Sequence, residues 1–359
     1  MHVPDGMINL PVSAAAGVVA AGAVAVSLRG ARRELGSGPL AEGHGAERTA
    51  PLAGLVAAFV FAVQMLNFPV AAGTSGHLLG GALAAILVGP YTGVLCIAVV
   101  LLMQGILFAD GGLTALGVNI TVMGVVTVIV SYGIFRGLLR ILPRKRRSVT
   151  VSAFVAALVS VPAAAAAFTL LYAIGGTTHI PVGKVLTAMV GVHVLIGIGE
   201  AAITALTVGA VIAVRPDLVH GARGLAAPLK LRVGGELVDA PAPAPVAAAG
   251  SRSPRGLLAA GLGTALLLAG VVSFYASASP DGLEKVAADK GIDRKVEEHA
   301  AADSPLADYG IEDISNTRLS GGLAGMIGVG ATVVVGSGIF YVVHRRRTPA
   351  NAPVATGRS

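Results

Sequence analysis

The sequence predicts an all-α polytopic membrane protein, with a seven-helix bundle followed by a two-helix C-terminal membrane unit. Of its 359 residues, 54% are hydrophobic and only 13% are charged, whereas a soluble domain carries about a quarter charged residues. Apolar segments of roughly 20 residues, the length that crosses a bilayer, recur along the chain, and basic residues cluster between them. A water-facing surface of this size would need more charge, so these observations exclude a soluble enzyme.

Nine apolar segments are predicted to cross or enter the membrane. They cover residues 8–28, 51–68, 75–89, 91–109, 116–140, 150–174, 184–214, 256–276 and 320–343. Residues 75–89 are short for a span and rich in glycine, so we expect this segment to be tilted, broken or re-entrant. Residues 184–214 are longer than a span needs, and we expect them to tilt or to run past the membrane surface.

The basic residues indicate how the chain is oriented. Four clusters of Lys and Arg, at or beyond the ends of the first, fifth, seventh and ninth segments, hold 20 of the 26 basic residues. An extracellular N-terminus places all four clusters on the cytoplasmic side, as the positive-inside rule requires. We therefore predict a multi-pass protein of the plasma membrane with a cytoplasmic C-terminus. This placement accounts for the net charge of +7 without a nucleic-acid partner.

Composition divides the chain into two membrane units. We predict a first unit at 1–225, a Pro/Ala-rich cytoplasmic linker at 226–255, a second unit at 256–345 and a cytoplasmic tail at 346–359. The second unit has two spans and an outer segment, 277–319, with ten acidic and five basic residues. A helix is expected around 283–301. The outer segment either raises the local concentration of cations or is a solvated loop.

The first residues of the chain, MHVPDGMINL, offer a metal chelate. The amine nitrogen of Met1, the amide nitrogen of His2 and the ring Nδ1 of His2 can form fused chelate rings around one ion. Nitrogen ligands in a plane suit Ni(II) or Cu(II). The first apolar segment has no basic residues before it, so we expect it to escape signal-peptide cleavage and to leave Met1 outside. A chance histidine at position 2 is the alternative.

A second histidine lies in a glycine-rich apolar segment, AAGTSGHLLGGALAAILVGPYTG at 71–93. An ionisable residue such as His77 is costly in a membrane helix unless it has a partner, which makes it a functional candidate. Its Nε2 could supply a fourth nitrogen, and the small residues Thr74 and Ser75 would let the N-terminal segment pack closely. The alternative is a histidine hydrogen-bonded between helices.

Further polar residues lie near the predicted outer ends of spans. Gln104, Asp110 and Asn119 could orient metal ligands by hydrogen bonding, although a helix cap explains Asp110 equally well. His193 and Glu200 share one helix face at i, i+7. They could relay protons, but we favour mutual hydrogen bonding between packed helices.

The sequence contains no recognisable nucleotide site. The nearest match to a phosphate loop, TTHIPVGKV at 177–185, lacks the first glycine and the Ser or Thr after Lys184. Active transport must therefore draw on partner subunits or on a gradient. No metalloprotease or Ser-His-Asp pattern is present, and the single cysteine, Cys96, excludes a disulfide within the chain.

Three motifs resemble the CbiM/NikM substrate-capture subunit of energy-coupling-factor cobalt or nickel importers. They are MHVPDG, GTSGHLLGGALAAILVGP and LFADGGLTALGVNI, and the resemblance covers about residues 1–225. The segment SPDGLEKVA at 279–287 resembles the CbiN/NikN accessory protein with its PDGLE sequence, here fused to the first unit.

The resemblance implies a seven-helix capture unit with the N-terminus outside. It also implies Ni(II) or Co(II) as the transported substrate, held by the Met1 amine, the amide and ring of His2, and His77. The implied partners are a transmembrane coupling subunit and cytoplasmic ATPase subunits. The alternatives are a stand-alone secondary transporter, a membrane metal sensor and an intramembrane enzyme. Both metals accept nitrogen donors, so the sequence leaves nickel and cobalt open.

Overall fold

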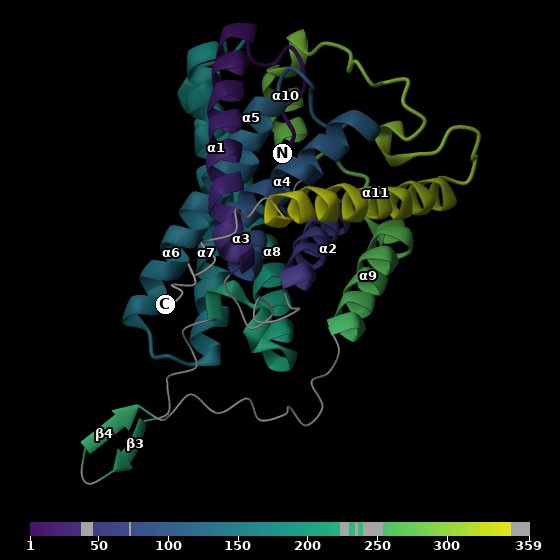
Figure 1. The fold of residues 1–359 in the computed structure, drawn as a ribbon. Coiled ribbons are helices and arrows are strands. Elements are labelled where there is room, and N and C mark those ends of the chain that lie inside the picture. Colours follow the sequence, from purple (N-terminus) through teal and green to yellow (C-terminus); the bar gives the residue numbers. More distant parts are fainter. Residues whose placement is uncertain (37–45, 72, 223–229, 234–235, 240–253, 346–359) are drawn as a thin grey trace, which may run out of the picture.

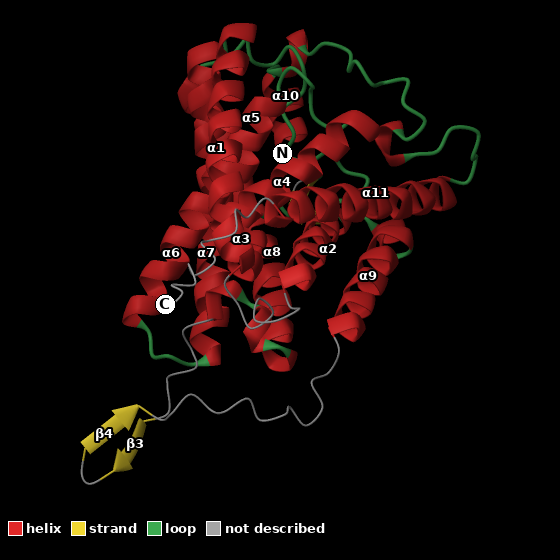
Figure 2. Cartoon of the chain, viewed as in Figure 1, coloured by secondary structure: helices red, strands yellow, loops and turns green. Residues whose placement is uncertain are grey.

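The computed structural model describes residues 1–36, 46–71, 73–222, 230–233, 236–239 and 254–345. Within these ranges the protein is a helical bundle with two short hairpins (Figures 1 and 2). The α-helices are α1 (Leu10–Gly36), α2 (Ala46–Gln64), α3 (Gly81–Val88), α4 (Pro90–Leu107), α5 (Leu116–Asn119), α6 (Thr127–Ile141), α7 (Arg146–Gly175), α8 (Val182–Val214), α9 (Pro254–Gly270), α10 (Gly282–Lys290) and α11 (Thr317–Arg345). A π-helical turn, η2 (Ile120–Val126), joins α5 to α6.

Seven of the described helices are long and apolar enough to cross a membrane. They are α1, α4, the continuous α5–η2–α6, α7, α8, α9 with the short η5 (Val272–Tyr275), and α11. This confirms the predicted class of polytopic all-α membrane protein. With α5–η2–α6 counted once, the part of the first unit that the structure describes has seven helices, and α9 and α11 supply the two long helices of the second.

The second and third predicted segments are not full-length spans. Residues 75–89 form the end of strand β2 (Thr74–Gly76), a coil and the eight-residue α3. At 1.5 Å per residue α3 is about 12 Å long, well short of the roughly 30 Å hydrocarbon core. Gly80 and Gly89 bracket α3 with φ of 84° and 103°, a backbone region that ends regular helix. The expected broken segment is confirmed.

Segment 51–68 is also shorter than a span. Helix α2 ends at Gln64, and the chain continues into strand β1 (Phe68–Ala71), which pairs with β2 in an antiparallel hairpin. The Gln64 side chain donates to the carbonyl of Leu79 at 2.9 Å, so the end of α2 is tied to the coil before α3.

The second membrane unit packs on the first through α11 and α9, both of which contact α2 (Figure 1). The contact is close: a Cβ added to Gly328 in α11 would lie 2.3 Å from Phe61 Cζ in α2. Small residues at this interface let the two helices approach each other, as is usual in membrane proteins.

The outer segment is folded onto the first unit near Met1 (Figure 1). Backbone hydrogen bonds run from Ser277 N–H to Asn67, from Glu297 N–H to Asp5 and from Asp308 N–H to Phe108. Because these bonds attach it to the bundle, the segment is not the solvated loop that was one of the two alternatives. The helix expected at 283–301 ends at Lys290, where Gly291 takes a left-handed C-cap conformation.

The linker contains one feature that the sequence did not predict. Two described segments within it, β3 (Lys230–Val233) and β4 (Glu236–Asp239), pair as antiparallel strands. The remainder of the predicted linker, apart from its last two residues, and the predicted tail at 346–359 lie outside the described residues.

Candidate metal centre

The N-terminal segment is inserted into one end of the bundle. Met1 is only 2% exposed and Val3 is fully buried. The side chain of Asn119 binds both polar backbone groups of Val3. Val3 N–H donates to Oδ1 at 2.7 Å, and Nδ2 donates to the Val3 carbonyl at 3.1 Å. Gly112 N–H donates to the same carbonyl at 2.9 Å. Asn119 therefore fixes the backbone directly after His2.

Asp5 anchors the next turn of the segment. Its carboxylate accepts hydrogen bonds from Leu113 N–H at 3.1 Å, from Thr114 N–H at 2.8 Å and from the Thr114 hydroxyl at 2.5 Å. Asp5 was not among the residues predicted from the sequence, although the Asp-Gly pair of MHVPDG is a turn signal. Asp5 and Asn119 together hold residues 1–6 against the loop that follows α4.

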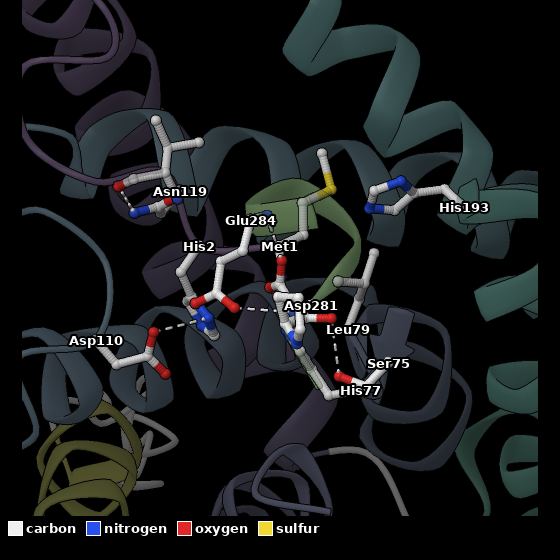
Figure 3. A network of polar contacts seen from close by, with 12 residues as sticks. Met1, His2, Ser75, His77, Leu79, Asp110, Asn119, His193, Asp281 and Glu284 are labelled. Carbon is white, nitrogen blue, oxygen red and sulfur yellow. Dashed lines mark hydrogen bonds and ion pairs between the residues drawn. The ribbon is translucent and has the colours of Figure 1, made fainter. Parts of the chain in front are cut away.

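The Met1 amine and His77 meet in this pocket (Figure 3). The amine nitrogen lies 2.5 Å from His77 Nε2, and His77 is 5% exposed. An ammonium group only donates, so Nε2 must accept, and the ring proton is on Nδ1, which donates to the Leu78 carbonyl at 3.0 Å. This tautomer directs the Nε2 lone pair into the pocket, the arrangement that a metal-binding histidine requires.

Asp281, from the outer segment, is the third member of the cluster. Its Oδ2 accepts from the Met1 amine at 2.5 Å and lies 3.5 Å from His77 Nε2. Burial opposes ionisation of Asp281, but the charge of the Met1 ammonium holds the pKa of this carboxyl well below its usual range. Asp281 also caps α10 in a capping box with Glu284, a pattern readable from D-x-x-E in the sequence. Asp281 was predicted from the sequence only as one of the acidic residues of segment 277–319.

The ring of His2 stacks on that of His77, with centroids 5.1 Å apart and planes 12° apart. Its Nδ1 lies 3.0 Å from Asp110 Oδ1, and its Nε2 lies 3.2 Å from Gln104 Oε1. Burial lowers the pKa of His2 to about 4, so the ring is neutral at pH 7 and keeps a lone pair. In this arrangement Nδ1 faces Asp110 rather than the Met1 amine.

The structure thus brings Met1, His2 and His77 together, and adds Asp281. The ligand atoms of His2, His77 and Asp281 all lie within 4.8 Å of one another, as a metal site requires. Ser75 lies beside them and binds the PDGLE segment: its hydroxyl donates to the Ser279 carbonyl at 2.7 Å. Thr74 is buried in β2 next to Ser75.

A cavity of about 790 Å³ opens beside the cluster. His2, His77 and Asp281 line it at one side. Its wall carries five carboxylates and one guanidinium: Asp110, Asp281, Glu284, Asp293, Asp308 and Arg318. A concave space whose wall carries more negative than positive groups concentrates cations.

His193 and Glu200 do not form the predicted mutual pair. Glu200 accepts from the backbone N–H groups of Leu79 at 2.7 Å and Gly80 at 3.2 Å, whereas His193 Nδ1 lies 2.7 Å from the Met189 carbonyl. The prediction was wrong because the broken backbone before α3 exposes N–H groups that a buried carboxylate can satisfy. Glu200 therefore supports the turn that follows His77.

A buried donor cluster at one end of span-length helices is typical of a membrane protein that handles a metal ion. Residues 2–218 match the CbiM family, described as the cobalt uptake substrate-specific transmembrane region, and residues 255–345 match the PDGLE domain. The chain belongs to the CbiM family of metal transport proteins, and a PDGLE domain follows its CbiM region. The resemblance seen in the sequence is confirmed.

Several known proteins are similar to this chain. A putative metal transport protein of Haloquadratum walsbyi is 39% identical over 219 residues, covering 61% of this chain and 93% of the relative. The putative fused nickel transport protein NikMN of Archaeoglobus fulgidus is 37% identical over 225 residues, covering 61% and 68%. The cobalt transport protein CbiM of Geobacter sulfurreducens is 34% identical over 224 residues, covering 61% of each. The crystal structure of a transition metal transporter aligns with a TM-score of 0.51 at 26% identity, covering 60% of this chain and 93% of that one.

Proposed function

We propose that this protein is the substrate-binding membrane subunit of an ATP-driven energy-coupling-factor importer for Ni(II) or Co(II). The metal is chelated by the Met1 amine, the His2 amide and Nδ1, and His77 Nε2. The observation that carries the proposal is the 2.5 Å approach of the Met1 amine to His77 Nε2 in a buried pocket. Relatives named for nickel and for cobalt transport support either metal as substrate.

Metal binding requires local changes in this pocket. The Met1 ammonium and the His2 amide each lose one proton to water, and the His2 ring turns its Nδ1 from Asp110 toward the amine. The backbone after His2 does not need to move, because Asn119 holds both polar groups of Val3. The chelate therefore forms by rotation of one side chain on a fixed backbone, which keeps the ordering cost of binding low.

The acidic cavity is the route by which the metal reaches the site. Its carboxylates attract a hydrated cation, and residues 277–319 contribute four of the five, all except Asp110. We therefore assign the outer segment a role in loading the metal. The N-terminus and this segment face the outside of the cell, and the C-terminus faces the cytoplasm.

The energy for transport comes from partner chains. The sequence has no phosphate-binding loop, so the proposal requires a transmembrane coupling subunit and cytoplasmic ATPase subunits. A stand-alone secondary transporter would take up metal in cells that lack any such partner. A membrane metal sensor would bind metal without uptake.

Uptake of radiolabelled nickel and cobalt by cells that express the chain with and without the partner subunits tests the proposal. We expect uptake only with the partners, and its loss when His2→Ala is introduced or when one alanine is inserted before Met1, because either change destroys the fused chelate. His179→Ala, an exposed histidine on the predicted outer side, is the matched control. N-terminal sequencing of the purified protein must find Met1 first. Normal uptake by His2→Ala contradicts the proposal.

A further inference from the structure

We infer that Asp281 supplies a carboxylate oxygen to the same metal, so that the PDGLE domain completes the coordination sphere. The inference rests on the proposed nitrogen chelate and adds a fifth donor to it. Nothing in the chelate itself requires a ligand from residues 255–345. The consequence is that metal binding and docking of the second domain become coupled events.

The position of the carboxylate is the first argument. Asp281 Oδ2 lies 2.5 Å from the Met1 amine nitrogen and 3.5 Å from His77 Nε2, close to two of the proposed ligands (Figure 3). The other oxygen, Oδ1, is used by the helix cap, where it accepts from Glu284 N–H at 2.8 Å. The two oxygens therefore have separate tasks, and Oδ2 is directed into the pocket.

Local structure fixes Asp281 relative to His77. Ser75 N–H donates to the Pro280 carbonyl at 2.8 Å, and the Ser75 hydroxyl donates to the Ser279 carbonyl at 2.7 Å. Residues 279–280 are thus bonded to strand β2, and His77 directly follows that strand. Gly282 packs so closely that a Cβ there would lie 2.7 Å from Ile196 Cδ1. Asp281 and His77 consequently belong to one hydrogen-bonded unit.

Charge balance is the second argument. The Met1 amine and both imidazoles are neutral as ligands, and a deprotonated His2 amide carries one negative charge. A divalent ion bound by these groups alone leaves one net positive charge in a pocket where every ligand is buried or half-buried. The Asp281 carboxylate brings the centre to neutrality, which lowers the cost of holding the ion away from water.

A fifth donor also changes the electronic state of the metal. Ni(II) with four nitrogens in a plane is diamagnetic, and an axial oxygen makes it paramagnetic. Co(II) readily accepts five or six donors, so an oxygen donor widens the site to include cobalt. Four planar nitrogens alone favour Ni(II) and Cu(II).

The test uses purified full-length protein loaded with Ni(II). Asp281→Ser and Asp281→Asn remove the carboxylate but keep a good helix cap, so α10 should still form. Asp289→Asn, an exposed carboxylate on the same helix that pairs with Lys285, is the control. The measurements are Ni(II) affinity by calorimetry, spin state by magnetic susceptibility, and the number of nickel ligands by X-ray absorption.

We expect paramagnetic Ni(II) with an oxygen ligand in the wild type and in Asp289→Asn. Asp281→Ser should give diamagnetic, planar Ni(II) and about tenfold weaker binding. A diamagnetic wild type, or an Asp281→Ser protein with unchanged spin state and affinity, overturns the inference. His2→Ala separates the two hypotheses. If His2→Ala abolishes Ni(II) binding while Asp281→Ser changes nothing, the nitrogen chelate is supported and the fifth ligand is contradicted. If the His2→Ala protein binds Ni(II) normally, both hypotheses are contradicted.

Discussion

The Tyr309 hydroxyl, from the PDGLE domain, donates to Asp110 Oδ2 at 2.6 Å. The other oxygen of Asp110 faces His2 Nδ1 at 3.0 Å, so Tyr309 acts on His2 through Asp110. Burial and the nearby Asp110 raise the pKa of Tyr309 well above its ordinary value, and its hydroxyl therefore stays protonated and donates. The PDGLE domain thus contacts the amine of the proposed chelate through Asp281 and acts on the His2 ring indirectly, through the bond from Tyr309 to Asp110.

Tyr309→Phe should raise the pKa of His2 from its value of about 4. Burial lowers this pKa, and the negative charge of Asp110 opposes that effect. Without the Tyr309 hydroxyl, the Asp110 charge is less compensated and stabilises a protonated His2 more strongly. His2 should then begin to charge at a higher pH as the solution is acidified.

The measurement is an NMR titration of the His2 ring in metal-free protein with labelled histidine, assigned with His2→Ala. Tyr275→Phe, which alters a tyrosine that is 80% exposed, is the control. A His2 pKa that stays the same or falls in Tyr309→Phe would show that the hydroxyl does not act on the ring.

Asn119→Ala should loosen the N-terminal segment and weaken metal binding by about 10- to 100-fold. The substitution leaves the buried N–H of Val3 without its acceptor, at a cost of about 1–3 kcal/mol, whereas the Val3 carbonyl keeps the hydrogen bond from Gly112 N–H. The measurement is Ni(II) affinity, together with the rate at which an aminopeptidase removes Met1. Asn316→Ala, which removes the N-cap side chain of α11, should leave both values near the wild type. Unchanged protection of Met1 in Asn119→Ala would contradict this role.

Much of the site could be predicted because its donors have unusual chemical contexts. A histidine directly after a free amine and another in an apolar glycine-rich segment are both difficult to explain as ordinary structure, and the structure places His2 and His77 in ring contact. Asp281 could not be predicted as part of the candidate site. It is one of ten acidic residues in 277–319, and nothing in the sequence indicates that it lies near Met1, 280 positions away.

The fold could be predicted where the length of an apolar segment determines the structure. It was harder to predict where the structure depends on the local backbone conformation. The long apolar segments form long helices. Helix α3, in contrast, is limited to eight residues by Gly80 and Gly89, whose backbone conformations depend on their surroundings. The same break explains the error at Glu200. A carboxylate spaced seven residues from a histidine on one helix looks like its partner, whereas the N–H groups of Leu79 and Gly80 become available only after the chain has turned.

Glu200→Ala should destabilise the protein and displace His77. It removes both acceptors for the N–H groups of Leu79 and Gly80 inside the bundle, a loss of about 1–3 kcal/mol for each unsatisfied group. We expect a melting temperature several degrees lower in detergent and weaker Ni(II) binding. Glu200→Gln keeps one acceptor oxygen, so its melting temperature and Ni(II) affinity should lie between those of the wild type and of Glu200→Ala. Glu298→Ala, on the exposed outer segment, is the control, and equal melting temperatures for all four proteins would remove the proposed support of the His77 turn.

Gly328→Ala should push helix α11 away from helix α2 and so loosen the contact between the two membrane units. A glycine-to-alanine change elsewhere in α11 should not do this. A Cβ at Gly328 would lie 2.3 Å from Phe61 Cζ and 2.7 Å from Phe108 Cζ, so α11 must shift away from α2 at an overpacking cost of about 1–3 kcal/mol. Gly330→Ala is a matched control, because a Cβ there meets nothing within 4 Å. We expect only Gly328→Ala to lower the melting temperature and reduce metal uptake. Phe61→Leu, which removes part of the obstructing ring, should partly restore both in the Gly328→Ala background. If the two glycine variants behave alike, close packing of α11 on α2 is not what holds the PDGLE domain over the proposed metal site.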